Sequence, residues 1–157
     1  MEIKILRPED AAVLLAVGPD VFDDAVNPRV ATEFLNDPRH HLVAAIDRGV
    51  VVGFASAVHY VHPDKRSPEM WINEVGVATT HRGRGVARAI LQRLLEVARA
   101  MGCAEAWVLT DRSNEAALRL YKSSGGIEAS GDHVMLTFRL QDGEASDKAD
   151  DDPLASA

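Results

Sequence analysis

The stretch Val75-Gly76-Val77-Ala78-Thr79-Thr80-His81-Arg82-Gly83-Arg84-Gly85-Val86-Ala87 joins two different hydrophobic patterns. The residues before it, from Met70, are typical of a buried strand, whereas the apolar residues after it recur at helical spacing. Two close glycines let a backbone approach a ligand closely, and the N–H groups and dipole at a helix N-terminus attract anions. Arg82 and Arg84 add positive charge. The stretch therefore predicts a strand, loop and helix whose residues 82–87 bind a pyrophosphate.

Two common nucleotide motifs fit this loop poorly. A Walker loop requires Gly-Lys-Ser/Thr after its glycines, and those residues are missing here. A dinucleotide fingerprint requires a third glycine where Arg88 stands, and it belongs to an early strand–helix unit. The loop at residues 82–87 lies past the middle of the chain instead. A pyrophosphate carrier other than a nucleotide of these two classes is favoured.

A second motif follows the loop: Asn114-Glu115-Ala116-Ala117-Leu118-Arg119-Leu120-Tyr121, then Gly125-Gly126. Together, Arg82-x-x-Gly85-x-Ala87 and this Asn-x-x-Ala-x-x-Leu-Tyr pattern resemble the two signatures of the GNAT superfamily of N-acetyltransferases. The resemblance covers roughly residues 2–140. It implies an acetyl-CoA-dependent N-acetyltransferase, with acetyl-CoA as co-substrate and no metal.

The periodicity of the remaining chain predicts one α/β domain. We expect the order strand, two helices, three strands, helix, strand, helix, strand. A turn at Arg48-Gly49 between two β-branched runs predicts a hairpin. The last strand is expected at 134–140. Together with this order, the resemblance implies a single α/β domain of the GNAT type over residues 1–141, with a mixed, mostly antiparallel central sheet flanked by helices.

Composition and charge limit which molecules this protein is expected to bind and where in the cell it is expected to be found. The net charge of −7 argues against nucleic-acid binding, which depends on Lys and Arg at phosphates. Residues 142–157 are acidic and almost without large apolar side chains, so we expect an acidic disordered tail. No apolar run approaches the roughly 20 residues of a membrane span, and the N-terminus lacks the pattern of a secretory signal. The single cysteine, Cys103, permits no intrachain disulfide, so a cytoplasmic location is expected.

The resemblance assigns the donor site residue by residue. It implies that the backbone of Arg82, Gly83, Arg84, Gly85, Val86 and Ala87 binds the CoA pyrophosphate. It also implies that the strand edge from Val75 to Val77 pairs with the pantetheine arm, as an added strand would. The N–H of Val77 would polarise the acetyl carbonyl. Asn114 would hydrogen-bond the pantetheine arm from the other side.

Acetyl transfer to an amine needs a base for the amine and an acid for the departing sulfur. The resemblance makes Tyr121 the general acid, and a phenol stays protonated at neutral pH. Glu74 is the first candidate for the base, because partial burial beside apolar neighbours would raise its pKa toward neutrality. Asp111 is the other candidate, as base or as amine-binding group. Cys103 is expected to be a structural thiol, and the histidines at 40–41 and 59–62 lack the partners of a zinc site.

The acceptor is expected to be a small-molecule cationic amine. The surroundings of Glu74 and of Thr110-Asp111, with Phe22-Asp23 upstream, look most like the type I aminoglycoside 3-N-acetyltransferases. In that interpretation Asp23, Asp24, Glu74 and Asp111 surround a polycationic sugar. Another small amine, such as a polyamine or an amino acid, and a protein N-terminus remain alternatives, as does a non-catalytic CoA-binding domain. The resemblance is compatible with a homodimer.

Overall fold

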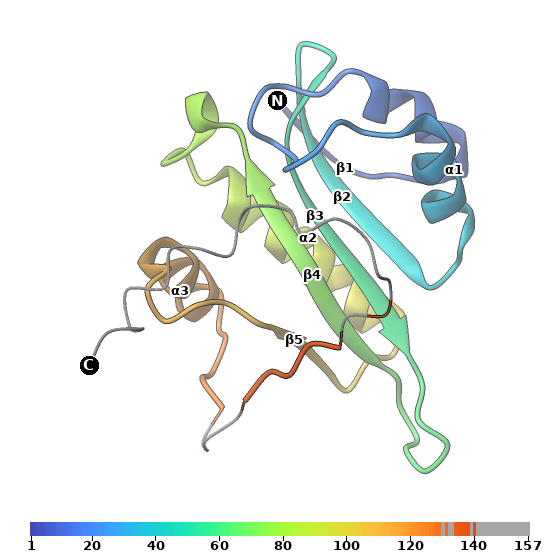
Figure 1. The fold of residues 1–157 in the computed structure, drawn as a ribbon, viewed down its shortest axis with the longest axis vertical. Helices are drawn as coiled ribbons and strands as arrows, with labels where there is room; N and C mark the ends of the chain where they lie inside the picture. The colour runs from blue at the N-terminus through green and yellow to red at the C-terminus, as the bar shows by residue number, and fades with distance from the viewer. Residues whose placement is uncertain (130, 132–133, 139, 141–157) are drawn as a thin grey trace.

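The structure is a computed structural model, and it describes residues 1–129, 131, 134–138 and 140. The elements follow the predicted order as far as the last helix (Figure 1). They are β1 (Glu2–Ile5), the 3-10 helix η1 (Pro8–Leu15), α1 (Pro28–Asn36), β2 (His40–Asp47), β3 (Val50–Tyr60), β4 (Glu69–Val77), the 3-10 turn η2 (Thr79–His81), α2 (Val86–Ala100), β5 (Glu105–Val108) and α3 (Glu115–Ser123).

The five strands form one sheet in the order β1-β2-β3-β4-β5. The first four are antiparallel neighbours, and β5 joins β4 in parallel. The turn between β2 and β3 has positive φ at both Arg48 (51°) and Gly49 (81°), as a type I′ hairpin turn requires. The predicted mixed, mostly antiparallel sheet is thus confirmed.

One part of the core lies between the sheet and α2, which packs across β2, β3 and β4 and lies behind the sheet in Figure 1. Leu14 of η1 and Ala31 and Leu35 of α1 are also buried in the core. The buried face of α2 repeats at helical spacing and includes Val86, Ile90, Leu94 and Ala98. η1 and α1 lie beside β1 and β2. The loop 20–27 approaches the end of β4, where the Val21 carbonyl lies against Gly76.

A β-bulge at Asn73 changes which face the end of β4 presents. Ile72 lies opposite Ala57, but Glu74 lies opposite Ser56, so Asn73 is an extra residue in β4. A bulge reverses the alternation of side chains beyond it. Ile72 is therefore buried at 3% exposure, whereas Glu74, two residues later, faces a cavity.

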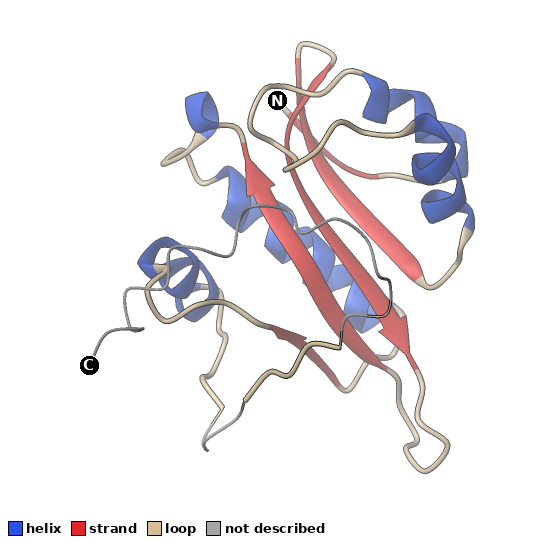
Figure 2. Cartoon of the chain, viewed as in Figure 1, coloured by secondary structure: helices blue, strands red, loops and turns tan. Residues whose placement is uncertain are grey.

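Pairing between β4 and β5 stops at the same point. Within the described residues it covers only Glu69–Ile72 of β4, opposite Glu105 to Val108. The two strands then diverge, and α3 lies beyond the end of β5 (Figure 2). The edge of β4 from Glu74 to Val77 is consequently free of β5.

Some expectations from the sequence need correction. The first predicted helix is a 3-10 helix rather than an α-helix, and the Asp10 carboxylate accepts from the Arg7 N–H (3.1 Å) at its start. Residues 134–138 form no strand and are exposed, although their apolar alternation predicts one. An alternation of apolar and polar residues does not by itself provide a neighbouring strand with which residues 134–138 could pair. The predicted tail at 142–157 lies outside the described residues. None of the described helices is long and apolar enough to span a membrane.

Candidate active site

The glycine-rich loop has the backbone conformation that its sequence predicts. Gly83 and Gly85 have φ values of 71° and 78°, in the left-handed region that favours glycine. Gly85 occupies the N-cap of α2, so the first N–H groups of that helix are directed toward the loop. The Arg82 Nε donates to the Val77 carbonyl (2.9 Å), which ties the loop to the end of β4. This geometry provides an anion site.

A cavity of about 540 Å³ extends from this loop. Its walls come from the glycine-rich loop, the free part of β4, the start of the loop 20–27 and one face of α3. It includes Val75, Val77, Arg82, Gly83, Gly85, Val86, Ala87 and Asn114 of the predicted donor site. Arg84 does not line this cavity, whereas Arg88, one helical turn later, does. The motif contains Arg84 and not Arg88. Because Arg88 follows Arg84 by four residues, helical spacing could have indicated Arg88 as a further basic residue of the site.

The two motif residues on α3 reach the same cavity. The Asn114 Oδ1 accepts from the Ala117 N–H (3.0 Å) and so caps the helix, which leaves the amide nitrogen as a donor. Tyr121 lines the same cavity about two helical turns further along α3, and burial raises the pKa of its phenol above the ordinary value. The Tyr121 hydroxyl therefore carries its proton at neutral pH.

We call the cavity that extends from the glycine-rich loop the donor cavity. Glu74 lies where this donor cavity meets a second cavity. Glu74 and Asp23 are the two residues that line both cavities. Desolvation raises the pKa of the Glu74 carboxyl above its ordinary value, and the negative charge of Asp23 raises it further. A carboxylate with a raised pKa beside a donor channel can accept a proton from an amine.

The second cavity, of about 450 Å³, is a feature that sequence reasoning missed. It lies between α1, the loop 20–27 and β3, on the face of the sheet opposite α2. Asp24 lines it together with Asp23 and Glu74, but most of its walls are apolar. The sequence signal that could have indicated this cavity is the helical spacing of apolar residues in α1, which places Val30, Ala31 and Phe34 on one face.

Gly76 also has a role that the motif did not indicate. A Cβ on Gly76 would lie 2.3 Å from the Val21 carbonyl oxygen and 2.7 Å from Cε1 of Phe54. A glycine inside a strand commonly marks such a close backbone approach. Gly76 therefore allows the loop 20–27 to cross β4 and to hold Asp23 near Glu74.

Several other predicted residues lie elsewhere. Asp111 is exposed after β5 and lines neither cavity. Burial raises the pKa of Cys103, which also lines neither cavity. His41 Nε2 and His59 Nδ1 lie 2.8 Å apart, and no group of three metal-ligand side chains occurs among the residues that the structure describes.

The chain is similar in sequence to a family of known proteins and to individual members of it. The model of the acetyltransferase (GNAT) family matches residues 9–125. The N-alpha-acetyltransferase RimI of Mycobacterium tuberculosis (strain ATCC 25618 / H37Rv) is 36% identical over 107 residues, which cover 67% of this chain and 63% of that protein. The chain thus spans less than two thirds of this relative's length.

Solved structures show the same fold at lower identity. An aminoglycoside acetyltransferase from an uncultured soil metagenomic sample aligns with a TM-score of 0.72 and 23% identity, over 88% of this chain and 98% of that one. A ribosomal-protein-alanine N-acetyltransferase from Brucella melitensis biovar Abortus 2308 aligns with a TM-score of 0.68 and 21% identity, over 87% and 98%. At these identities the likeness establishes the fold alone.

Proposed function

This chain belongs to the acetyltransferase (GNAT) family, whose members use acetyl-CoA, and we propose that it transfers the acetyl group of acetyl-CoA to a primary amine. The observation that carries the proposal is the continuous cavity from the glycine-rich loop, along the free edge of β4, to Glu74 and Tyr121. The residues of the loop, 82–87, would bind the pyrophosphate. The β4 edge would pair with the pantetheine arm and direct the thioester toward Glu74.

In the proposed reaction the amine attacks the thioester carbonyl directly. Glu74 takes a proton from the ammonium group, and the freed nitrogen lone pair forms the C–N bond. The Val77 N–H stabilises the oxyanion. The C–S bond then breaks, Tyr121 gives its proton to the sulfur, and the second proton of the nitrogen is released to solvent. Tyr121 is reprotonated from solvent and Glu74 loses its proton to solvent, so one proton is released per turnover. The products are the acetamide and CoA thiol.

The choice of Glu74 over Asp111 as base rests on their positions. Glu74 lines the donor cavity and has a pKa raised by desolvation, whereas Asp111 lines neither cavity. We therefore propose Glu74 as the base and leave Asp111 outside the reacting groups.

An aminoglycoside, acetylated at its 3-N position, is one candidate acceptor. Asp23, Asp24 and Glu74 supply three carboxylates around the second cavity, which suits a substrate with several ammonium groups. A small monoamine or a protein N-terminus is the other candidate, because most of the cavity's remaining lining is apolar.

Release of free thiol from acetyl-CoA in the presence of an amine panel tests the proposal. We expect turnover with at least one amine, and a loss of about 100-fold or more in kcat for Glu74→Gln and Tyr121→Phe. Asp111→Asn should retain kcat within a few-fold. Undiminished turnover in both Glu74→Gln and Tyr121→Phe would contradict these roles, and a large loss in Asp111→Asn would transfer the base role to that residue.

A further inference from the structure

The second cavity has apolar walls over most of its extent. Its floor is core: Phe54 is 1% exposed and stacks on Phe22, with ring centroids 3.9 Å apart. At the edge, Val30 is 49% exposed although it is apolar. The main apolar lining residues are Phe22, Val26, Val30, Phe34, Leu42 and Phe54.

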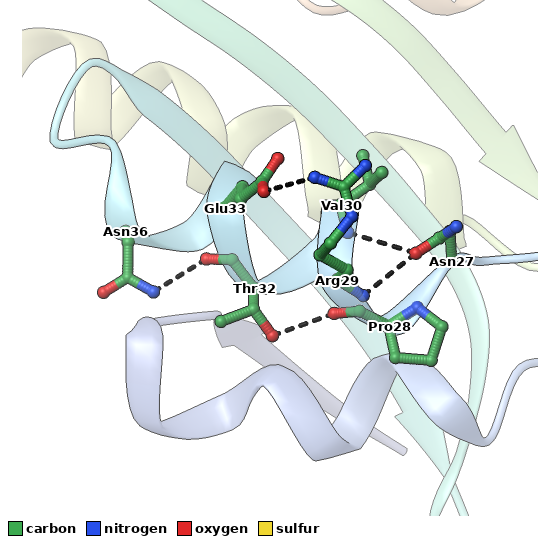
Figure 3. A network of polar contacts seen from close by, with 7 residues as sticks. All are labelled: Asn27, Pro28, Arg29, Val30, Thr32, Glu33 and Asn36. Atoms are coloured by element: carbon green, nitrogen blue, oxygen red, sulfur yellow. Dashed lines mark hydrogen bonds and ion pairs between the residues drawn. The ribbon is translucent and has the colours of Figure 1, made fainter.

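The polar groups of α1 add little polar surface to the cavity, because they form hydrogen bonds and an ion pair with one another (Figure 3). Asn27 lines the cavity, but its Oδ1 accepts from the N–H groups of Arg29 (3.0 Å) and Val30 (3.3 Å) and caps the helix. Arg29 also pairs with Glu33 (2.6 Å). The Thr32 hydroxyl donates to the Pro28 carbonyl (2.8 Å). The face of α1 that lines the cavity therefore offers apolar contact.

The acidic side chains that line the second cavity are Asp23, Asp24 and Glu74. Asp23 and Glu74 line both cavities, and Asp24 lies next to them on the exposed loop. Beyond them, the other polar side chains that line the second cavity, among the described residues, are Ser56 and the helix-capping Asn27. One ammonium group placed between Asp23 and Glu74 would face the donor cavity. The rest of the acceptor would then lie against the apolar walls.

We propose that the acceptor is a primary amine carried on an apolar group, about as large as an aromatic or branched aliphatic side chain. This inference rests on the proposed acetyl transfer and names its substrate class. A volume of about 450 Å³ falls in the range of small-ligand sites. A polycationic sugar fits poorly, because its hydroxyl and ammonium groups would lose water against Phe22, Val30 and Phe34 without gaining hydrogen bonds.

A series of linear amines from ethylamine to hexylamine tests the apolar contact. Each added methylene that enters the cavity should raise kcat/KM about fourfold until the cavity is filled. Phenethylamine should exceed ethylamine, whereas spermidine and gentamicin should be poorer substrates than hexylamine. Short peptides that begin with Leu or with Gly distinguish a chain terminus from a free small amine: a preference for Leu over Gly is expected if peptides enter at all.

A pair of valine variants ties the selectivity to the cavity. Val30→Glu places a charge at the exposed edge, and a carboxylate in the first turn of a helix does not destabilise it. Val61 is also apolar, is 76% exposed and lies outside the cavity, so Val61→Glu is the matched control. Val30→Glu should lower kcat/KM for hexylamine at least tenfold and for ethylamine little. Val61→Glu should leave the ratio unchanged, and both variants should keep the parent's affinity for CoA.

The outcomes separate this inference from the function beneath it. If no amine releases thiol although CoA binds, the proposed acetyl transfer fails. If amines are acetylated but kcat/KM is independent of chain length, or is highest for gentamicin or spermidine, only the apolar acceptor is wrong. An unchanged hexylamine-to-ethylamine ratio in Val30→Glu would also overturn it.

Discussion

Replacing Gly76 by alanine tests how the loop 20–27 is held over β4. The added Cβ would lie 2.3 Å from the Val21 carbonyl oxygen, where 3.4 Å is the lower limit of ordinary contact, so loop and strand must separate by about 1 Å. Val21 and Phe54 are both buried, at 3% and 1% exposure, and neither can move into solvent cheaply. Overpacking of this kind costs about 1–3 kcal/mol. The loss of glycine's freedom in the unfolded chain offsets about 0.5–1 kcal/mol.

The net effect is a loss of about 1–2 kcal/mol in the free energy of unfolding, measured by urea denaturation. Because the displaced loop carries Asp23, KM for the amine should rise as well. Gly102→Ala is the control: its φ of 74° makes alanine strained there, but a Cβ meets nothing within 4 Å and the site is distant. Gly102→Ala should lose stability without changing KM for the amine. If Gly76→Ala matched the parent in both stability and KM, the close crossing of loop and strand would be wrong.

Two further predictions concern pH. The rate should rise as Glu74 loses its proton, with an apparent pKa above the ordinary value of a glutamate. Asp23→Asn should shift this acid limb of the profile to lower pH, because it removes a neighbouring negative charge. If the pH profile of kcat/KM is the same in Asp23→Asn as in the parent, the interaction between Asp23 and Glu74 is wrong. Burial and the adjacent His59 lower the pKa of His41 from 6.5 to about 4, so protonation favours the unfolded chain. The stability that neutral His41 supports is complete above about pH 6.5 and is lost as the pH falls toward 4. Urea denaturation should therefore show a decline of about 1–2 kcal/mol between pH 7 and pH 5 that His41→Gln reduces.

The donor half of the site could be predicted from the sequence because it is local. Gly83 and Gly85 specify their own backbone conformation, and Asn114 and Tyr121 lie two helical turns apart on one helix. Short-range rules of this kind need no knowledge of distant contacts. Both motifs consequently line one cavity.

The acceptor half could not be predicted in the same way, because it is assembled from distant segments. Phe22, Phe34, Leu42 and Phe54 come from a loop, a helix and two strands, and each alone has the pattern of an ordinary core residue. The bulge at Asn73 has no sequence signal that separates it from regular strand. For the same reason, the sequence could not separate Glu74, which lines both cavities, from Asp111, which lines neither.

The most direct test of the account is CoA binding by titration calorimetry to Gly85→Asp. An aspartate there would place a side chain and a negative charge where the loop is proposed to bind pyrophosphate. Gly49→Asp is a closely matched control, because Gly49 has φ of 81° against 78° for Gly85, and a Cβ at either position meets nothing within 4 Å. Both variants add the same strain and charge. We predict that the Kd for CoA rises at least about 100-fold in Gly85→Asp and stays unchanged in Gly49→Asp. An unchanged Kd in Gly85→Asp would contradict the assignment of the loop as the CoA site.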